Sequence, residues 1–198
     1  SRTVRAGDVF FALPGSAGHG IDHAEQALSR GAAYLVSDRA HPRALRVEDA
    51  HAALHTLGRA ARARLRAPVI AVTVSAGKTT TKTLITNALA ARSTPGNLNT
   101  PPALVAALVE AVLMDQAADD TSPPLAHNTG AIHGPGGAGS ELVLELGIDR
   151  LGEMDELIAL TRPDHGLITT IGEAHLSALR DPATVAIEKS KLLVSVDG

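Results

Sequence analysis

The stretch "VTVSAGKTTTK", residues 72–82, carries a glycine, a lysine and hydroxyl side chains in an order suited to holding phosphate. Gly77 allows a turn whose backbone N–H groups point inward, the Lys78 ammonium can reach outer phosphates, and the Thr79 hydroxyl can bind Mg²⁺. The full pattern G-x-x-x-x-G-K-[ST] requires glycine at position 72, where this chain has valine. The short match therefore indicates a nucleotide phosphate site, with a plain strand-to-helix turn as the alternative.

Three further ionisable side chains are candidates for the same chemistry. Glu145 lies near the carboxyl end of the expected strand "ELVLEL", where ligands bind in open α/β sheets, although a strand-end carboxylate can also point to solvent. His175 follows the run "LITTI", where a histidine is often simply hydrogen-bonded. Lys189 shares an apolar helical stripe with Val185 and Leu192, and a snorkelling lysine is the usual explanation. Burial lowers the pKa of a lysine, however, and only a neutral amine reacts with CO₂, so Lys189 could carry a carbamate.

These residues follow an alternating series of expected elements. Strands are predicted at 8–13, 33–38, 68–74, 141–146 and 166–171, and helices at 22–32, 49–67, 79–91 and 151–162. The continuous β-branched run at 68–74 is typical of a strand buried on both faces. Such alternation predicts an α/β fold with parallel sheets and helices on both faces.

The break before Pro68 is the predicted domain boundary. We expect a small N-terminal α/β domain at residues 1–67 and a phosphate-loop, parallel-sheet ATP-binding domain at 68–198. Residues 115–140 are rich in Gly, Pro, Asp and Ser, which predicts a mobile surface insertion. Its two histidines, His127 and His133, are expected to be solvated rather than zinc ligands.

Composition excludes several classes of protein. Of 198 residues, 44% are hydrophobic and 20% charged, which is ordinary for a soluble globular protein. A net charge of −3 and the lack of a Lys or Arg run favour neither nucleic acid nor an anionic membrane surface. No apolar stretch approaching ~18 residues and no signal-peptide core is evident, so a cytoplasmic location is expected. Without cysteine there is no disulfide or thiolate chemistry.

Motifs spread over nearly the whole chain resemble, in one order, those of the Mur ligase family. "SAGKTTTKTLITNALA" and "TPGNLN" are similar to its ATP-binding domain, and "SRTVRAGDVFFALPG" to its N-terminal UDP-sugar-binding domain. "ELVLELGIDRLGEM", "RPDHGLITTIGEAHL" and "VAIEKSKLL" complete the set. Several motifs in one order are more specific than any single one.

The chain most resembles the family member that joins D-alanyl-D-alanine to UDP-N-acetylmuramoyl-tripeptide in the cytoplasm. This resemblance implies an ATP- and Mg²⁺-dependent ligase of peptidoglycan synthesis, which serves cell-wall biogenesis, cell shape and cell division. ATP would phosphorylate the substrate carboxylate, and the dipeptide amine would attack the acyl phosphate. A monomer without nucleic-acid or membrane partners is expected. The alternatives are the ligase for the third peptide residue and a non-catalytic relative that binds a nucleotide or UDP-sugar.

The resemblance also implies roles for individual residues. ATP would lie on Ser75, Ala76, Gly77, Lys78, Thr79 and Thr80, with Lys78 on the β- and γ-phosphates. One Mg²⁺ would bind Thr79 and Glu145, and a second would bind His175 and a carbamylated Lys189. Lys78, Lys189 and His175 would be the catalytic residues. The substrate would contact Ser1, Arg2, Gly20, Asp22, Asn97 and Asn99.

The chain departs from the family pattern at several positions. Val74 stands where the family has the first glycine of its loop, and a β-branched residue there is expected to obstruct phosphate binding. "TPPALV" replaces the family's Asn-x-Ile-Gly-x-Pro, and "HGID" lacks the aspartate and histidine that usually flank Gly20. The match also stops before the end of the central domain and lacks the third domain, so these residues are expected not to catalyse by themselves.

Overall fold

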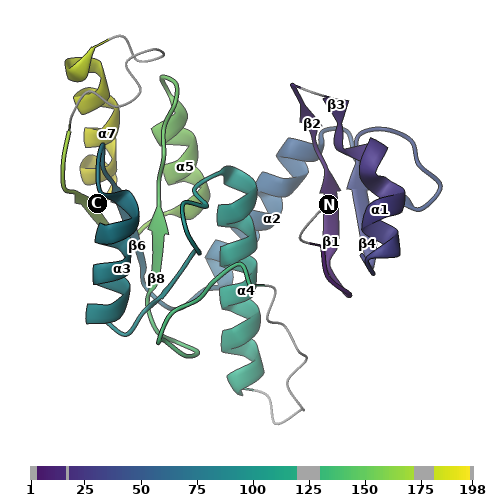
Figure 1. Cartoon of the computed structure of the whole chain (residues 1–198), viewed down its shortest axis with the longest axis horizontal. Coiled ribbons are helices and arrows are strands. Elements are labelled where there is room, and N and C mark those ends of the chain that lie inside the picture. The colour runs from purple at the N-terminus through teal and green to yellow at the C-terminus, as the bar shows by residue number, and fades with distance from the viewer. Residues whose placement is uncertain (1–3, 17, 120–129, 172–180, 197–198) are drawn as a thin grey trace. The chain divides into compact units, whose positions relative to one another are not determined.

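The computed structural model describes residues 4–16, 18–119, 130–171 and 181–196, which form two compact units, 1–57 and 58–198 (Figure 1). The units divide inside helix α2 (Ala50–Arg64), whereas the predicted boundary lies after this helix, at Pro68. The later part of α2 packs in the second unit. A Cβ atom at Gly58 would lie 2.6 Å from Leu160, and Arg62 Nε donates to the Thr161 carbonyl at 2.8 Å.

The first unit is built on a short parallel sheet. Strands β1 (Val9–Ala12), β4 (Tyr34–Ser37) and β5 (Ala44–Arg46) pair in the order β1-β4-β5, beside an antiparallel pair of β2 (Pro14–Gly15) and β3 (Gly18–His19). The chain then enters the 3₁₀ helix η1 (Gly20–His23) and helix α1 (Ala24–Ser29). A Cβ atom at Gly20 would lie 2.8 Å from the backbone of Ala12, so this turn requires glycine.

The second unit is a four-stranded parallel sheet covered by helices. Its strands are β6 (Val69–Thr73), β7 (Arg92–Ser93), β8 (Leu142–Glu145) and β9 (His165–Ile168), in the order β7-β8-β6-β9. Its helices are α3 (Lys78–Ala88), α4 (Pro101–Asp119), α5 (Glu153–Thr161) and α7 (Pro182–Val196). The central strands β6 and β8 are almost wholly buried, as expected for parallel strands covered on both faces. The predicted α/β fold is confirmed.

Helix α4 was not predicted from the sequence. Its residues Pro101–Ala118 are long and apolar enough to cross a membrane by length and composition, in contrast to the expectation above, although 39% of them are buried. Leu104, Ala107, Leu108 and Ala111 are each 0% exposed. These buried residues pack one side of α4 into the core of the second unit.

Described residues at both ends of the predicted mobile insertion, 115–140, are tied to the core. Helix α4 continues to Asp119, and the buried Glu110 carboxylate accepts the N–H groups of Ala131 at 2.7 Å and Ile132 at 3.1 Å. His133 is exposed but exchanges backbone hydrogen bonds with Ser93. His127 lies outside the described residues.

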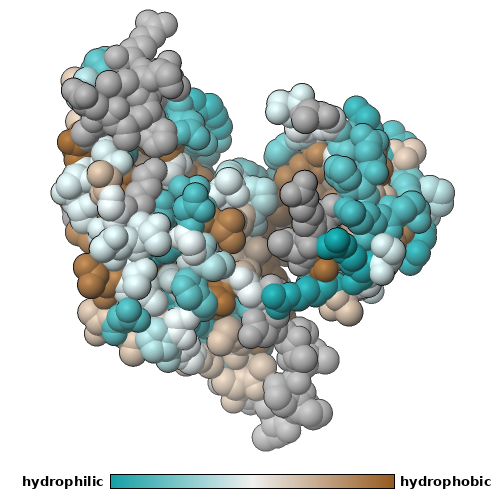
Figure 2. Space-filling model, viewed as in Figure 1, coloured by the Kyte–Doolittle hydropathy of each residue, from teal (hydrophilic) through white to brown (hydrophobic). Residues whose placement is uncertain are grey.

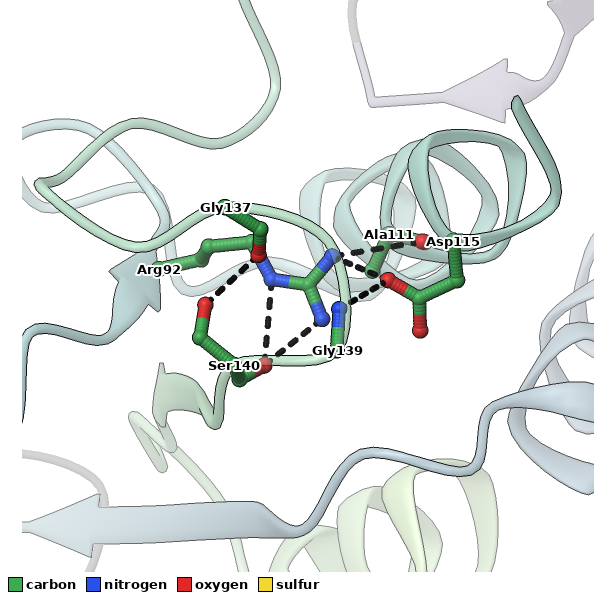
Figure 3. A network of polar contacts seen from close by, with 6 residues as sticks. All are labelled: Arg92, Ala111, Asp115, Gly137, Gly139 and Ser140. Atoms are coloured by element: carbon green, nitrogen blue, oxygen red, sulfur yellow. Dashed lines mark hydrogen bonds and ion pairs between the residues drawn. The ribbon is translucent and has the colours of Figure 1, made fainter. Parts of the chain in front are cut away.

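A second anchor of this segment is the buried guanidinium of Arg92. It donates to the Ser140 and Ala111 carbonyls and pairs with the Asp115 carboxylate at 2.8 Å, so it joins β7, α4 and the loop that precedes β8 (Figure 3). The Gly139 N–H donates to the same Asp115 oxygen at 2.8 Å. A buried cation that donates to several carbonyl groups can hold a glycine-rich loop in one conformation. Composition alone predicts that such a loop is mobile.

Figure 2 shows hydrophobic atoms in separate patches among polar ones on the face in view. Exposed apolar side chains include Leu84 and Ile187, at 64% and 66% exposure. Scattered exposure of this kind is normal for a protein surface.

Candidate functional site

The topology of the second sheet creates a crevice between β6 and β8. The connection that leaves β6 leads to β7 on one side of the sheet, whereas the connection that leaves β8 leads to β9 on the other. Because such crossovers are right-handed, the helices that follow β6 and β8 lie on opposite faces. Ligands bind at this kind of switch point, outside the carboxyl ends of the strands. The register places Glu145 beside Val72, so the phosphate loop and Glu145 flank the crevice.

The phosphate loop has the backbone conformation that its sequence predicts. Gly77 has φ 78° and ψ 21°, the left-handed conformation, and it is the N-cap of α3. A Cβ atom at Gly77 would meet nothing within 4 Å, so glycine is required by conformation rather than by space. Thr79 and Thr80 are exposed in the first turn of α3, where the helix favours anions.

The start of the loop is held by the segment after β9. The Ser75 N–H donates to the Thr170 carbonyl at 2.9 Å, and the Ala76 N–H approaches the Thr170 hydroxyl at 3.4 Å. Ser75 and Ala76 therefore have partners within the protein in this structure.

The side chain of Val74, which was predicted to obstruct phosphate binding, is turned into the core. Val74 is 0% exposed and packs with Val72, Ala91 and Val143 in the core, and its φ is not positive. Ile85 of α3 packs against the same cluster. The side chain of Val74 thus faces the core beneath the loop, and it continues the apolar run of β6 instead of lying where phosphates would bind.

Glu145 does not point to solvent. Its side chain is 0% exposed, and Oε1 accepts a hydrogen bond from Asn99 Nδ2 at 3.1 Å. Oε2 is buried and has no hydrogen-bond partner among the described residues, and the same holds for Thr73 Oγ1 at the end of β6. Buried polar atoms are normally paired. A buried carboxylate oxygen that accepts no hydrogen bond at a strand end is an acceptor that a bound cation in the crevice would complete.

Gly147 allows Asn99 to reach this carboxylate. A Cβ atom at Gly147 would lie 2.4 Å from Asn99 Nδ2. Asn99 was predicted to face the reacting carboxylate of a substrate, but in this structure its amide turns to Glu145. Asn97, in the same loop, is exposed.

Lys189 is buried and reaches the phosphate loop. It is 1% exposed, and its Nζ donates to Ser75 Oγ at 3.1 Å. A snorkelling lysine would place its ammonium in solvent, so that explanation is wrong here. The contact links α7 with the loop, 114 positions apart in the chain.

Lys82 belongs to the same cluster, although no sequence motif identified it as a site residue. Its side chain is buried, and its Nζ donates to Thr94 Oγ1 at 3.3 Å and to the Gly96 carbonyl, and lies 3.9 Å from Glu145 Oε2. Burial lowers the pKa of Lys82, and the nearby Glu145 carboxylate partly opposes this shift. The available signal was its position four residues after Lys78, inside the helix expected at 79–91.

Other predicted site residues are not brought to the crevice by the described structure. Ser1, Arg2 and His175 lie outside the described residues. Gly20 and the exposed Asp22 belong to the first unit. Within the described ranges, no group of three or more His, Cys, Asp or Glu side chains could hold a metal ion without further ligands.

A glycine-capped loop between a buried parallel strand and a helix, with a strand-end carboxylate beside it, is the arrangement of a phosphate-loop domain. The chain belongs to the Mur ligase family. The family model of the Mur ligase middle domain matches residues 72–197, and that of the Mur ligase family catalytic domain matches residues 1–76.

Curated relatives and solved structures agree with this assignment. The chain is 31% identical to the UDP-N-acetylmuramoyl-tripeptide--D-alanyl-D-alanine ligase of Bacillus subtilis, over 98% of this chain and 39% of that protein. It is 30% identical to the Synechocystis ligase of the same name, with the same coverage of both chains. The chain thus spans about two fifths of the length of these relatives.

Two similar solved structures are of MurF proteins. MurF ligase from Thermotoga maritima in complex with ADP has a TM-score of 0.71 and 26% identity, over 98% of this chain and 42% of that chain. MurF from Acinetobacter baumannii has a TM-score of 0.73 and 26% identity, over 98% and 40%.

Proposed function

We propose that this protein is an ATP-dependent ligase that joins D-alanyl-D-alanine to UDP-N-acetylmuramoyl-tripeptide through an acyl phosphate. The observation that carries the proposal is the buried Glu145 Oε2, which accepts no hydrogen bond from the described residues, across the crevice from the glycine-capped loop. The names of the relatives support this substrate pair, and the Thermotoga maritima complex with ADP supports ATP as the nucleotide.

The residues present fit one Mg²⁺. This ion binds oxygen, usually through one or two carboxylates with phosphate oxygens and water. Glu145 Oε2 has no hydrogen-bond partner among the described residues, and Thr79 is exposed in the first turn of α3, so the carboxylate oxygen and the Thr79 hydroxyl suit the role. The bound ion would offset the repulsion between the γ-phosphate and the substrate carboxylate.

The chain's own residues would position the nucleotide. We assign the β- and γ-phosphates to Lys78 and to the backbone from Ser75 to Thr80, with the N-terminus of α3 supplying partial positive charge. The Ser75 and Ala76 N–H groups, now engaged with Thr170, would have to turn from it to bind phosphate. Charge neutralisation and alignment would provide most of the rate enhancement.

We assign a second Mg²⁺ to two ligands, His175 and a carbamylated Lys189. As an amine, Lys189 donates to Ser75 Oγ, whereas a carbamate oxygen would accept a hydrogen bond from the Ser75 hydroxyl. The same neighbour therefore serves both forms. Its burial next to the loop supports this assignment.

The remaining assignments concern the substrate. They use residues of the first unit and, separately, residues of the loop after β7. We assign the UDP-sugar to Ser1, Arg2, Gly20 and Asp22, and the tripeptide carboxylate to the loop of Asn97 and Asn99. The protein would act as a cytoplasmic monomer in cell-wall growth and division, without nucleic-acid or membrane partners.

The test is calorimetric titration of Mg·ATP into the full-length protein and its Lys78→Ala variant, followed by a phosphate-release assay. We expect binding that the variant loses, and release that needs both UDP-muramoyl-tripeptide and D-alanyl-D-alanine. Release with a single amino acid and the UDP-muramoyl-dipeptide would identify the third-residue ligase instead. Nucleotide binding without release on any pair would identify a non-catalytic relative.

A further inference from the structure

We propose that Lys82 is a positioning residue of the nucleotide site, one that holds the loop at residues 94–99 and the Glu145 carboxylate in the geometry that binds the cation of Mg·ATP. This inference rests on the proposed function. It adds a residue that neither the phosphate-loop motif nor the implied metal ligands include.

The Nζ atom of Lys82, a residue of α3, contacts the segment after β7 and the end of β8. The side chain leaves α3, and its Nζ contacts Thr94 Oγ1 at 3.3 Å, the Gly96 carbonyl and Glu145 Oε2 at 3.9 Å. Thr94 and Gly96 follow β7, whereas Glu145 ends β8. The same loop carries Asn99, whose amide donates to Glu145 Oε1. Lys82 thus fixes the segment from which Asn99 approaches the carboxylate.

The Lys82 ammonium lies close enough to Glu145 to balance its charge but too far away to form a hydrogen bond with it. The Lys82 side chain is 2% exposed and that of Glu145 is 0% exposed, so each ion is stabilised mainly by the other and by its polar neighbours. At 3.9 Å, however, Nζ is too far from Oε2 for a hydrogen bond. Lys82 therefore compensates the charge of Glu145 without occupying the Oε2 lone pairs, which remain available to a divalent cation.

Two other roles for Lys82 make different predictions. If Lys82 only stabilised the fold, its loss would lower stability and leave nucleotide affinity unchanged. If the ammonium only substituted for the metal charge, its loss would strengthen Mg²⁺ binding, because one competing cation would be gone. A positioning role predicts weaker Mg²⁺-dependent binding, because the Glu145 carboxylate and the Asn99 loop lose their orientation.

The experiment uses Lys82→Met, which keeps most of the side-chain length and removes the charge. Binding of ATP to the full-length protein is measured by calorimetry with and without Mg²⁺. We expect Lys82→Met to lose about tenfold or more in Mg·ATP affinity, the usual range for groups that orient metal ligands. Metal-free ATP binding should change far less. Thr94→Val, which removes one anchor but keeps the charge, should shift Mg·ATP affinity in the same direction by a smaller factor.

Arg62→Met is the matched control. It removes a cation that is 12% exposed and pairs with Asp164 at 2.7 Å. Asp164 directly precedes β9 and so lies at the amino end of a strand, whereas the crevice lies at the carboxyl ends. Thermal unfolding of each variant reports its loss of stability. If Lys82→Met does not fold, the Mg·ATP affinity of Thr94→Val tests the inference by itself. An affinity equal to that of the unmodified protein would overturn it.

The outcomes also separate this inference from the proposed function. If the unmodified protein binds Mg·ATP while Lys82→Met loses only stability, as Arg62→Met does, or binds Mg²⁺ more tightly, the positioning role is wrong and the proposed function stands. If the unmodified protein does not bind Mg·ATP, both are wrong.

Discussion

Asn99 and Glu145 lie 46 positions apart in the chain, yet Asn99 Nδ2 donates a hydrogen bond to Glu145 Oε1 at 3.1 Å. The bond fixes one carboxylate oxygen and leaves Oε2 buried without a hydrogen-bond partner in the described part of the chain. A carboxylate held in this way is pre-oriented for a ligand on one side.

Glu145→Gln should weaken Mg·ATP binding by about 10- to 100-fold, because it keeps the volume of the side chain and removes the charge that suits a divalent cation. Calorimetry with and without Mg²⁺ measures the effect. Glu156→Gln, at an exposed ion pair with Arg150, is the control and should bind as the unmodified protein does. Equal Mg²⁺ dependence in both variants would exclude Glu145 as a metal ligand.

Gly147→Ala should displace Asn99 from Glu145, because the new Cβ would lie 2.4 Å from Asn99 Nδ2. We expect a loss of about 1–3 kcal/mol in the free energy of unfolding and weaker Mg·ATP binding. Urea unfolding and calorimetry measure the two effects. At Gly137, where a Cβ atom would meet nothing within 4 Å, alanine should change neither quantity appreciably. Similar behaviour of the two variants would contradict the role of Gly147.

Val74→Gly should lower the free energy of unfolding by about 2–4 kcal/mol, because it empties a fully buried site and adds backbone entropy to the unfolded chain. ATP affinity should change little, since the Val74 side chain faces the core. Urea unfolding and ATP titration are the measurements. A large gain in affinity with intact stability would instead indicate that Val74 obstructs the phosphates.

The exposed Asp181 carboxylate should make stability depend on pH. The backbone N–H of Thr184, and next its hydroxyl, hydrogen-bond this carboxylate and lower its pKa from the ordinary 3.8. Because the folded-state pKa is lowered, the stabilisation is fully present above pH 3.8 and is lost as pH falls through the folded-state value.

Asp181→Asn is the matched variant, since asparagine also caps helices but does not titrate. At neutral pH it should be slightly less stable than the unmodified protein, and the difference should shrink in acid. Thermal unfolding from pH 7 to pH 3 measures it. A difference that does not vary with pH would show that the Asp181 charge contributes nothing.

Local signals predicted much of the second unit. The run at 68–74 became β6 (Val69–Thr73) because β-branched residues favour a strand buried on both faces, and Gly77 capped α3 because glycine readily adopts positive φ. Composition did not predict the order of residues 130–140. Arg92 and Glu110, which are distant in the chain, form hydrogen bonds with backbone groups of that loop. No local pattern contains such a contact.

By itself, the sequence determined the α/β class, the phosphate loop and the candidacy of Glu145 and Lys189, since these depend on residue type, periodicity and short spacing. Only the tertiary structure decided that Val74 faces the core and that Lys82, Asn99 and Glu145 meet. Strand order and crossover direction bring residues from different strand ends to one edge of a sheet. These are properties of long-range packing, which a motif of neighbouring residues cannot encode.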